Sequence, residues 1–340
     1  MTTYALNGLG RIGKLALKPL LERGAKIAWI NDAVGDPEMH AHLLEFDTVH
    51  GRWDARFDHD AESVTIDGTR LPFIGTGDLS ALPLEGVDVV IDCTGVFKTE
   101  AKLAPYFAAG VKKVVVSAPV KDGATANIVY GVNEATYDPA LHQIVTAASC
   151  TTNCIAPPIK VIKENIGIVH GSITTMHCIT NTQPLVDAIV GKKADPRRAR
   201  SGMNNLAPTS TNSATAITMI YPDLKGKLNG MAVRIPLMYA SLTDLTLELA
   251  RPTTKEEVNG FLESASKSAP LAGILGFESK PLVSSDYRSD SRSGIVDALS
   301  TMVVDETQLK LYVWYDNEYG YCARMVDVAT MVARAMDPRE

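Results

Sequence analysis

The stretch Asn7-Gly8-Leu9-Gly10-Arg11-Ile12-Gly13 decides how the first half of this chain folds. It carries the pattern G-x-G-x-x-G between an apolar run at Tyr4–Leu6, which predicts a strand, and an amphipathic run at Arg11–Arg23, which predicts a helix. Glycines let such a turn bend tightly and approach a pyrophosphate, whose charge then lies at the helix N-terminus. The stretch therefore predicts a dinucleotide site near the start of the chain.

An acidic residue follows at the distance that such a site requires. Asp32 comes after the apolar run Lys26–Ile30, about 20 residues past Gly13. A carboxylate at this point accepts hydrogen bonds from a ribose diol and repels a 2′-phosphate, so NAD is favoured over NADP. The alternative is a structural turn with a solvated aspartate.

Apolar runs along the chain indicate the fold class. Short β-branched runs alternate with amphipathic stretches in the first half, which predicts a Rossmann-type, doubly wound parallel sheet of the α/β class. Longer runs in the second half predict an α+β domain with a mostly antiparallel sheet. The short runs are Lys26–Ile30, Val87–Cys93 and Lys113–Ser117, and the longer ones are Gly171–His177, Met231–Pro236, Thr243–Ala250 and Gln308–Tyr315.

We place the domain boundary near Ser149, with residues 1–149 in a first domain and 150–317 in a second. Apolar positions between Gly320 and Met336 recur at helical spacing and predict a terminal helix. The segment Pro184–Thr211 has little periodicity, which predicts an extended functional loop.

Composition excludes several classes of protein. The net charge of −6 disfavours a nucleic-acid binder, which usually carries a basic stripe. Five cysteines are an odd number in a long chain, so a disulfide framework is disfavoured and a reducing compartment is expected. No apolar run reaches the roughly 20 residues that span a bilayer, and a strand is predicted almost at Met1. We therefore expect a cytoplasmic protein without a membrane or nucleic-acid partner.

The segment Ala147–Cys154, which reads AASCTTNC, is the most informative stretch for chemistry. Ser149 suits an N-cap, so Cys150 is expected in the first turn of a helix. The positive helix end should lower the pKa of its thiol and favour a nucleophilic thiolate.

Two alternatives to a nucleophile stay open at this point. A free cysteine is often a small buried apolar residue. Cys150 and Cys154, with His170 or His177, could also bind a metal, although the second tight ligand pair of a structural zinc site is missing, so we expect no metal. His177, which ends a β-branched run, could pair with the thiolate and shuttle protons, or be a structural histidine.

Several stretches resemble the glyceraldehyde-3-phosphate dehydrogenase family. The resemblance runs in order from about Thr3 to Val332 and includes the glycine turn and the AASCTTNC segment. The other matching stretches are Ser117–Pro119, Asn229–Pro236 and Trp314–Tyr321.

The resemblance implies a covalent mechanism. Cys150 would attack the aldehyde of glyceraldehyde 3-phosphate, and His177 would take the proton. Hydride transfer to NAD would leave a thioester that inorganic phosphate cleaves to an acyl phosphate. The family also implies a homotetramer and a last helix, about 318–340, that packs back on the cofactor domain.

The resemblance also implies binding roles for individual residues. The cofactor site would comprise Gly8, Gly10, Arg11, Ile12, Gly13, Asp32, Thr94, Gly95, Phe97, Ser117 and Asn317. The substrate phosphate would bind Thr180, Thr182 and Arg234, and the attacking anion would bind Ser149, Thr151, Thr211, Asn212 and Arg197 or Arg200.

Some stretches depart from the family pattern. Asn212 stands where the family commonly has glycine, and the familiar proline that helps to exclude NADP is not evident near Ala188-Ile189. Stretches such as Thr180–Asp187 and Pro281–Tyr287 resemble the branch associated with arsenate-resistance operons, in which arsenate replaces phosphate. An erythrose-4-phosphate dehydrogenase and a non-catalytic NAD-binding sensor are the alternative functions.

Overall fold

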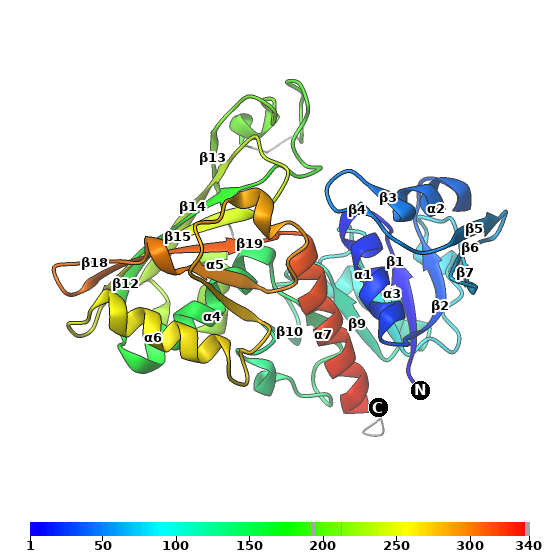
Figure 1. Cartoon of the computed structure of the whole chain (residues 1–340). Helices are drawn as coiled ribbons and strands as arrows, with labels where there is room; N and C mark the ends of the chain where they lie inside the picture. The colour runs from blue at the N-terminus through cyan, green and yellow to red at the C-terminus, as the bar shows by residue number, and fades with distance from the viewer. Residues whose placement is uncertain (192–194, 212, 337–340) are drawn as a thin grey trace. The chain divides into compact units, whose positions relative to one another are not determined.

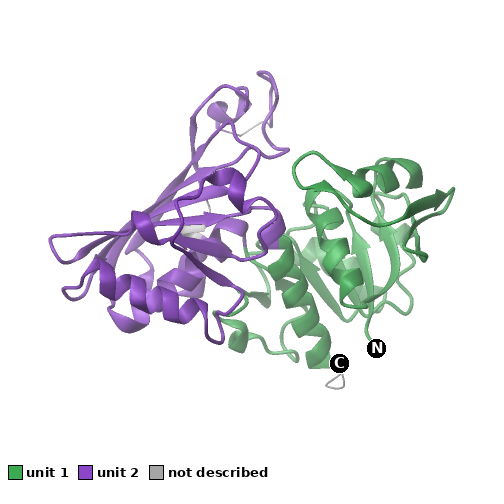
Figure 2. Ribbon diagram, in the orientation of Figure 1, with its two compact units in different colours: residues 1–148, 322–340 green, residues 149–321 purple. Residues whose placement is uncertain are grey.

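The computed structural model describes residues 1–191, 195–211 and 213–336. The chain divides into two compact units, which Figure 2 colours separately. Unit 1 comprises residues 1–148 and 322–340, and unit 2 comprises residues 149–321. These bounds differ by a few residues from the domain bounds expected from the sequence.

Unit 1 is built on a parallel sheet with the strand order β10-β11-β9-β8-β1-β2 (Figure 1). Two small antiparallel sheets, β3-β4 and β5-β6-β7, accompany it. The strands of unit 1 are β1 (Thr3–Asn7), β2 (Lys26–Asn31), β3 (Phe46–Asp47), β4 (Gly51–Arg52), β5 (Phe57–Asp60), β6 (Ser63–Ile66), β7 (Thr69–Pro72), β8 (Val89–Asp92), β9 (Lys113–Val116), β10 (Thr125–Asn127) and β11 (Ile144–Thr146). Its helices are α1 (Arg11–Glu22), α2 (Pro37–Glu45), α3 (Glu100–Ala108) and most of α7 (Tyr319–Met336).

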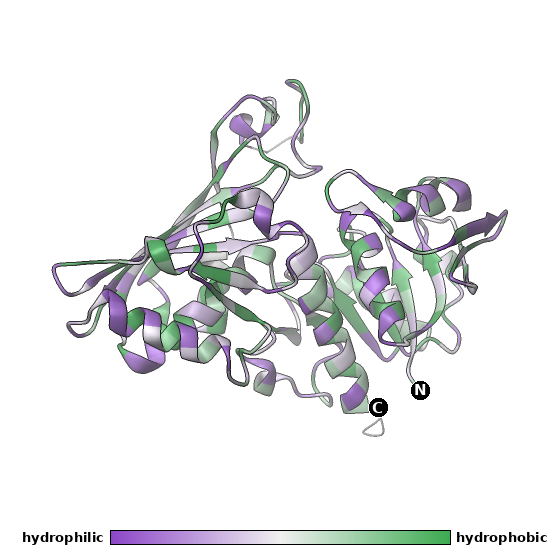
Figure 3. Ribbon diagram, viewed as in Figure 1, coloured by the Kyte–Doolittle hydropathy of each residue, from purple (hydrophilic) through white to green (hydrophobic). Residues whose placement is uncertain are grey.

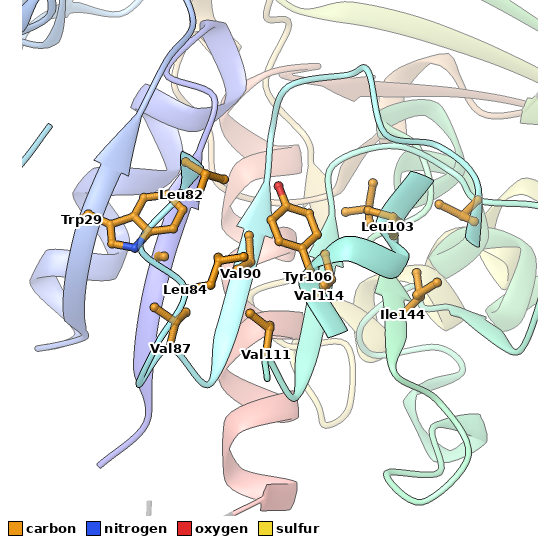
Figure 4. Packing of buried hydrophobic residues seen from close by; sticks show 13 residues of the cluster. Trp29, Leu82, Leu84, Val87, Val90, Leu103, Tyr106, Val111, Val114 and Ile144 are labelled. Atoms are coloured by element: carbon orange, nitrogen blue, oxygen red, sulfur yellow. The ribbon is translucent and has the colours of Figure 1, made fainter. Parts of the chain in front are cut away.

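Apolar side chains cover both faces of this sheet. On one face Ala5 belongs to a buried cluster with Leu103 and Tyr106 of α3, which Figure 4 shows from close by. On the other face the Tyr4 hydroxyl donates to the Ala329 carbonyl of α7 at 3.4 Å. In Figure 3 the strands of this sheet are mainly hydrophobic, whereas the hairpin around β5 is mainly hydrophilic. The doubly wound parallel sheet predicted from the sequence is thus confirmed.

The glycine turn between β1 and α1 is held by close backbone approach. Gly8 has a φ of +97°, and a Cβ there would lie 2.7 Å from the backbone carbon of Cys93. A Cβ on Gly13 would lie 1.8 Å from the Gly8 carbonyl oxygen. Gly10, the N-cap of α1, has no atom within 4 Å of such a Cβ. Gly8 and Gly13 are therefore needed by the turn itself, whereas Gly10 leaves open space above it.

Unit 2 is built on a mixed, mostly antiparallel sheet with the order β13-β14-β12-β15-β19-β17-β16, and β18 also pairs with β19. Its strands are β12 (Ile168–His177), β13 (Ala207–Ser210), β14 (Leu228–Arg234), β15 (Ser241–Leu249), β16 (Leu275–Glu278), β17 (Gly294–Asp297), β18 (Met302–Val304) and β19 (Gln308–Tyr315). Its helices are α4 (Cys150–Asn165), α5 (Ser213–Ile220) and α6 (Lys255–Ser266).

The helix α4 is buried along most of its length against this sheet. Cys154 contacts Thr243 of β15 and Val313 of β19, with its sulfur 3.8 Å from the threonine hydroxyl and from the valine carbonyl oxygen. A Cβ on Gly294 of β17 would lie 2.4 Å from the Cys154 carbonyl oxygen. The helix consequently has little freedom to shift, which fixes the position of its first turn.

The second-half strands predicted from the sequence are confirmed, with bounds that differ by up to a few residues. The segment Pro184–Thr211 is less irregular than expected, because it contains a 3-10 turn at Pro196–Ala199 and the strand β13. That strand pairs only at one edge with β14, which explains why its pattern is weak in the sequence.

The glycine turn yields a matched pair of variants. We expect Gly13→Ala to lower the free energy of unfolding by about 1–3 kcal/mol or more, because the new methyl group meets rigid backbone. Gly10→Ala should change stability far less, because its methyl group meets open space. Denaturant unfolding followed by circular dichroism checks both, and equal stability of the two variants would contradict the packing of this turn.

Candidate active site

A pocket of about 270 Å³ lies in unit 1, at the carboxyl ends of β1, β2 and β8. In a parallel sheet this edge, beside the point where the strand order reverses, is the usual place for a dinucleotide. The pocket is lined by Asn7, Gly8, Gly10, Asn31, Asp32, Ala33, Thr76, Gly77, Asp78, Leu79, Leu82, Cys93, Thr94, Val96 and Phe97. The structure therefore gathers five of the expected cofactor residues, Gly8, Gly10, Asp32, Thr94 and Phe97, around one pocket.

Asp32 serves the turn as well as the pocket. Its carboxylate accepts a hydrogen bond from the Leu9 backbone N–H at 2.8 Å and another from the Val34 N–H at 3.1 Å. These bonds hold the glycine turn against the end of β2 and leave the side chain half-buried at the pocket wall. A carboxylate held this way suits a ribose diol.

Other expected cofactor residues lie outside the lining of this pocket. Arg11 and Lys14 both form ion pairs with Asp47, and the lysine nitrogen lies 2.7 Å from the carboxylate. Burial raises the pKa of Asp47, but the hydrogen bonds from the Arg11 and Lys14 side chains outweigh burial and hold this pKa well below its usual range. The remaining expected residues of unit 1 that lie outside the lining of this pocket are Ile12, Gly13, Gly95 and Ser117, and Asn317 belongs to unit 2. Gly13 acts through the turn described above.

In unit 2 the reactive thiol lies at the start of the buried helix α4. Ser149 is the N-cap, and its hydroxyl accepts a hydrogen bond from the Thr152 N–H at 3.1 Å, as the sequence predicts. Cys150 is the first residue of the helix and is partly buried, whereas Cys154, one turn later, is fully buried. The capped helix thus presents a single accessible thiol at its N-terminal end.

His177 ends β12 and faces this thiol. Its Nε2 lies 3.7 Å from the Cys150 sulfur. Its Nδ1 lies 2.7 Å from the Cys178 carbonyl oxygen, which can only accept a hydrogen bond. A proton on Nδ1 would satisfy the carbonyl and leave Nε2 as an acceptor directed at the thiol, whereas the Arg234 Nη1 beside the same Nδ1 can only donate to it and favours the tautomer with the proton on Nε2.

Arg234 ends β14 directly beside His177. The two residues are paired in the parallel register of β12 and β14, and the arginine Nη1 lies 2.8 Å from the imidazole Nδ1. The same nitrogen donates to the Cys178 carbonyl at 3.3 Å. The strand register therefore places the positive charge of Arg234 beside the Nδ1 of His177, on the side of the ring away from Cys150.

The charge state of the pair differs from the expectation. Burial raises the pKa of the Cys150 thiol, and this outweighs the lowering by the Arg234 charge and by the backbone N–H groups of the helix start. Burial, and then the Arg234 charge, lowers the pKa of His177 to about 3. The helix end was expected to lower the thiol pKa and favour a thiolate, whereas burial raises the thiol pKa and favours a neutral thiol beside a neutral imidazole.

Three buried hydroxyl groups lie next to Cys150 and His177 and are hydrogen-bonded to one another. The Tyr315 hydroxyl lies 2.9 Å from the Thr151 hydroxyl and 2.8 Å from the Thr175 hydroxyl. The ring of Tyr315 meets the edge of His177 with centroids 6.2 Å apart. Thr151 was expected to bind an anion, but its hydroxyl is engaged by Tyr315 in this structure.

The threonines expected around the substrate phosphate lie just beyond β12. The hydroxyls of Thr180 and Thr182 are 2.8 Å apart, and the Gln183 side chain accepts from the Thr180 N–H at 3.3 Å. This turn follows His177 by only a few residues, so it lies at the same end of β12 as Arg234. Two hydroxyls and an arginine are suitable donors for a phosphate.

The arginines around the expected second anion site have different partners in the structure. Arg197 pairs with Asp195 at 2.7 Å, and Arg200 pairs with Asp187 at 2.5 Å. The residue between them, Arg198, donates to the Ser210 carbonyl at 3.2 Å.

The charge of Arg198 reaches the catalytic pair. It contributes to lowering the pKa of His177, after burial and Arg234, and it lowers the pKa of Arg234 after burial. The sequence has three arginines within the four positions 197–200, and only their tertiary contacts distinguish one from another. Ser210 directly precedes Thr211, another expected anion ligand, and Asn212 lies outside the described residues.

Asn317 is held in one orientation. The Ser241 hydroxyl donates to its side-chain oxygen at 3.0 Å, which leaves the amide N–H₂ group pointing elsewhere. The preceding residue, Asp316, accepts from the backbone N–H groups of Glu318 and Tyr319 and so caps the turn into α7. Asn317 therefore stands in a rigid turn, which suits a residue that orients a bound group.

Two further findings concern the described residues alone. In 1–191, 195–211 and 213–336, no three histidine, cysteine or acidic side chains gather in a way that could hold a metal ion. Every helix in these ranges is too short or too polar to cross a lipid bilayer.

Known proteins resemble this chain along almost its whole length. Residues 2–100 match the NAD binding domain of glyceraldehyde 3-phosphate dehydrogenase, and residues 149–317 match its C-terminal domain. Glyceraldehyde-3-phosphate dehydrogenase 3 of Nostoc sp. (strain PCC 7120) is 56% identical over 338 residues, covering 97% of this chain and 98% of the relative.

Relatives with lower sequence identity belong to the same family. Glyceraldehyde-3-phosphate dehydrogenase of Streptomyces coelicolor is 43% identical, covering 97% of this chain and 98% of its own length. Glyceraldehyde-3-phosphate dehydrogenase 1 of Bacillus subtilis is 42% identical, covering 97% of both chains. With this site and these matches, the chain belongs to the glyceraldehyde-3-phosphate dehydrogenase family.

Proposed function

We propose that this protein oxidises glyceraldehyde 3-phosphate with NAD and passes the acyl group to an inorganic anion. The observation that carries the proposal is the contact between the Cys150 sulfur and the His177 Nε2, 3.7 Å apart, with Arg234 at the far side of the imidazole. A thiol, a base and a fixed cation are what covalent oxidation of an anionic aldehyde requires. The family match supplies the substrate and the cofactor.

The unit 1 pocket fits a dinucleotide, because it joins a glycine turn, the N-terminus of α1 and the Asp32 carboxylate. NAD bound there would accept the hydride that leaves the substrate. Asp32 would hold a ribose diol, and Asn317, fixed by Ser241, would orient the nicotinamide amide. Asp32 and Asp78 on the same wall disfavour a 2′-phosphate, so NADP is the poorer cofactor.

The residues of unit 2 account for the acid–base steps. Cys150 gives its thiol proton to the His177 Nε2, and the sulfur then bonds to the aldehyde carbon. The resulting alkoxide takes a proton back as a thiohemiacetal hydroxyl. His177 removes that proton as the hydride departs, which leaves a thioester on Cys150. The oxygen of the attacking anion bonds to the carbonyl carbon, the C–S bond breaks, and the thiol regains a proton.

Two anion subsites follow from the arginines. Arg234, Thr180 and Thr182 at the ends of β12 and β14 suit the substrate's own phosphate. For the attacking anion we favour Arg198, because Arg197 and Arg200 are already neutralised by aspartates. Ser149 and Thr211 remain the proposed hydroxyl donors of this second subsite.

The identity of the attacking anion stays a prediction. Phosphate and arsenate have the same shape and charge, and neither Arg198 nor the hydroxyl groups distinguish them. A link to arsenate resistance therefore stays a prediction that rests on the sequence resemblance. Cytoplasmic localisation likewise stays a prediction.

A homotetramer is proposed from the family and agrees with the surface of unit 2. Large apolar side chains are exposed on the strands β14 and β18 and on the long loop after β12. They include Leu185, Val186, Ile189, Met231, Met302 and Val304. Large exposed apolar side chains are candidates for an interface between subunits.

The covalent mechanism is tested by Cys150→Ser. We expect no measurable formation of NADH from glyceraldehyde 3-phosphate, NAD and phosphate, because serine is far less acidic than cysteine. His177→Asn should lower kcat by about 10²–10⁴-fold through loss of the base. Cys154→Ser, from the next turn of the same helix, is the matched control and should keep most of the activity. Substantial turnover by Cys150→Ser would contradict the mechanism.

The same assay separates the alternative functions. A rate that is independent of phosphate, with erythrose 4-phosphate as the better substrate, would identify an erythrose-4-phosphate dehydrogenase. Tight NAD binding without turnover on either aldehyde, with phosphate or arsenate present, would identify a sensor.

Arginine variants test the second anion subsite. We expect Arg198→Ala to raise the KM for phosphate by about tenfold or more, because it removes a charge directed at the anion. Arg197→Ala and Arg200→Ala are matched controls and should leave this KM nearly unchanged, since both arginines are paired with acids. If Arg197→Ala or Arg200→Ala had the larger effect, the assignment of Arg198 would be wrong.

The effect of the Arg234 charge on the catalytic pair is tested by Arg234→Met and the pH dependence of Cys150 alkylation by iodoacetamide. The Arg234 charge lowers the pKa of Cys150, so its removal should move the midpoint of the alkylation rate to higher pH. Removal also raises the pKa of His177, which starts from about 3 and remains neutral. An unchanged midpoint, or one that moved to lower pH, would contradict the lowering of the thiol pKa by the Arg234 charge. Arg234→Lys should restore most of the original midpoint.

A further inference from the structure

A chain of buried polar side chains runs beneath the unit 1 pocket and has no part in the mechanism above. It consists of Asn31 at the end of β2, Asn7 at the end of β1, Tyr106 on α3 and Asp92 at the end of β8. All four are at most 2% exposed. The three residues at strand ends are neighbours, because β2, β1 and β8 are adjacent in the parallel sheet, and Tyr106 reaches them from α3.

Short hydrogen bonds join these four residues into one network. The Asn31 Nδ2 donates to the Asn7 Oδ1 at 2.7 Å, and the Asn7 Nδ2 donates to the Tyr106 hydroxyl at 2.6 Å. The Tyr106 hydroxyl donates to the Asp92 Oδ2 at 2.8 Å. The network therefore connects the ends of three strands through one phenol.

The Asp92 carboxylate determines which group donates and which accepts in each hydrogen bond of the network. Burial raises the pKa of Asp92, and the hydrogen bonds from Thr94 and Tyr106 oppose this rise; as a carboxylate Asp92 only accepts, so the Tyr106 hydroxyl donates to it and accepts from Asn7. The Asn7 amide then has its oxygen toward Asn31, whose N–H₂ group must donate. Both amide orientations thus follow from the carboxylate, and reversal of one bond would place two donors against each other.

Each end of the network forms hydrogen bonds with a loop that lines the pocket. The Asn31 side chain donates to the Thr76 carbonyl and accepts from the Thr76 N–H, both at 2.9 Å. At the other end the Asp92 Oδ1 accepts from the Thr94 hydroxyl at 2.7 Å and from the Thr94 N–H at 3.1 Å. Thr76 and Thr94 both line the pocket, together with Asn7 and Asn31 themselves.

The ring of Tyr106 adds a second contact to the pocket wall. It meets the ring of Phe97 edge to face, with centroids 6.4 Å apart, and Phe97 also lines the pocket. Figure 4 shows the Tyr106 ring beside Val90 and Val114, with its hydroxyl pointing away from Val111. The ring alone would complete the apolar cluster, so the hydroxyl is an addition that packing does not require.

Burial of this many polar groups is costly for stability unless all are satisfied. An apolar set of similar volume would pack the same space at lower cost. The network is nevertheless complete, and both of its ends are pocket loops. Its geometry therefore suits a device that sets the distance between these loops.

We propose that Tyr106 is a positioning residue for the dinucleotide, whose hydroxyl holds the 76–78 and 93–97 loops at the spacing that the cofactor requires. The proposal depends on the proposed function in one respect, which is that the cofactor is NAD. It predicts that loss of one hydroxyl weakens cofactor binding without altering the chemistry in unit 2.

The test uses the full-length protein and the variant Tyr106→Phe, which keeps the ring and its contact with Phe97. We expect the Kd for NAD, measured by fluorescence titration, to rise about tenfold, which corresponds to about 1.4 kcal/mol. The KM for NAD should rise in parallel, while kcat at saturating NAD stays within about twofold of the original value. Tyr4→Phe, which removes a buried hydroxyl on the opposite face of the same sheet, is the matched control and should leave the Kd unchanged.

Asp92→Asn tests whether the bonds act as one network. An amide at this position can donate to the Tyr106 hydroxyl, which then faces two donors and loses its own acceptor. We expect a rise in the Kd similar to that of Tyr106→Phe, and the double variant should be no worse than either single variant. Additive effects would overturn the network.

Separate outcomes identify which proposal fails. If Tyr106→Phe lowers the thermal unfolding midpoint but leaves the Kd for NAD unchanged, the hydroxyl is structural only and the inference is overturned. If the original protein oxidises the aldehyde with NAD in that case, the proposed function stands. If the original protein does not bind NAD, both the proposed function and the inference fail.

Discussion

The contact between the Cys150 sulfur and the His177 Nε2 is the interaction on which the rest of the candidate site depends. Its two residues come from different elements, the first turn of α4 and the last residue of β12. Because α4 is buried against the sheet at Cys154, its first turn cannot move without disturbing the core of unit 2. The separation of nucleophile and base is therefore set by helix-on-sheet packing rather than by a local loop.

Burial at this contact has an electrostatic consequence. It disfavours charge on both partners, so it raises the pKa of the thiol and lowers that of the imidazole. The strand register adds Arg234 behind the base, which favours the thiolate and disfavours the imidazolium. A phosphate bound to Arg234 would neutralise that charge and make His177 a better base. The same neutralisation would remove the charge that favours the thiolate, so substrate binding would act on both the base and the thiol through one guanidinium.

Unit 1 meets a different constraint, because a flexible dinucleotide needs several loops at fixed distances. The glycine turn fixes one of them through backbone contacts that leave no room for a side chain at Gly8 or Gly13. The buried amide, phenol and carboxylate groups beneath the pocket join two further loops. Backbone sterics and buried hydrogen bonds therefore share the task of shaping the pocket wall.

The sequence by itself determined the fold class, the glycine turn, the N-cap at Ser149 and the identity of Cys150 and His177 as candidates, because these features depend on local periodicity and capping. It did not separate Arg198 from its neighbours Arg197 and Arg200, since equal charges at adjacent positions look alike until their partners are known. It also suggested a lowered thiol pKa, whereas the burial that raises it exists only after the helix packs on the sheet. The Tyr106 network joins residues far apart in the chain, so only the tertiary structure could decide it.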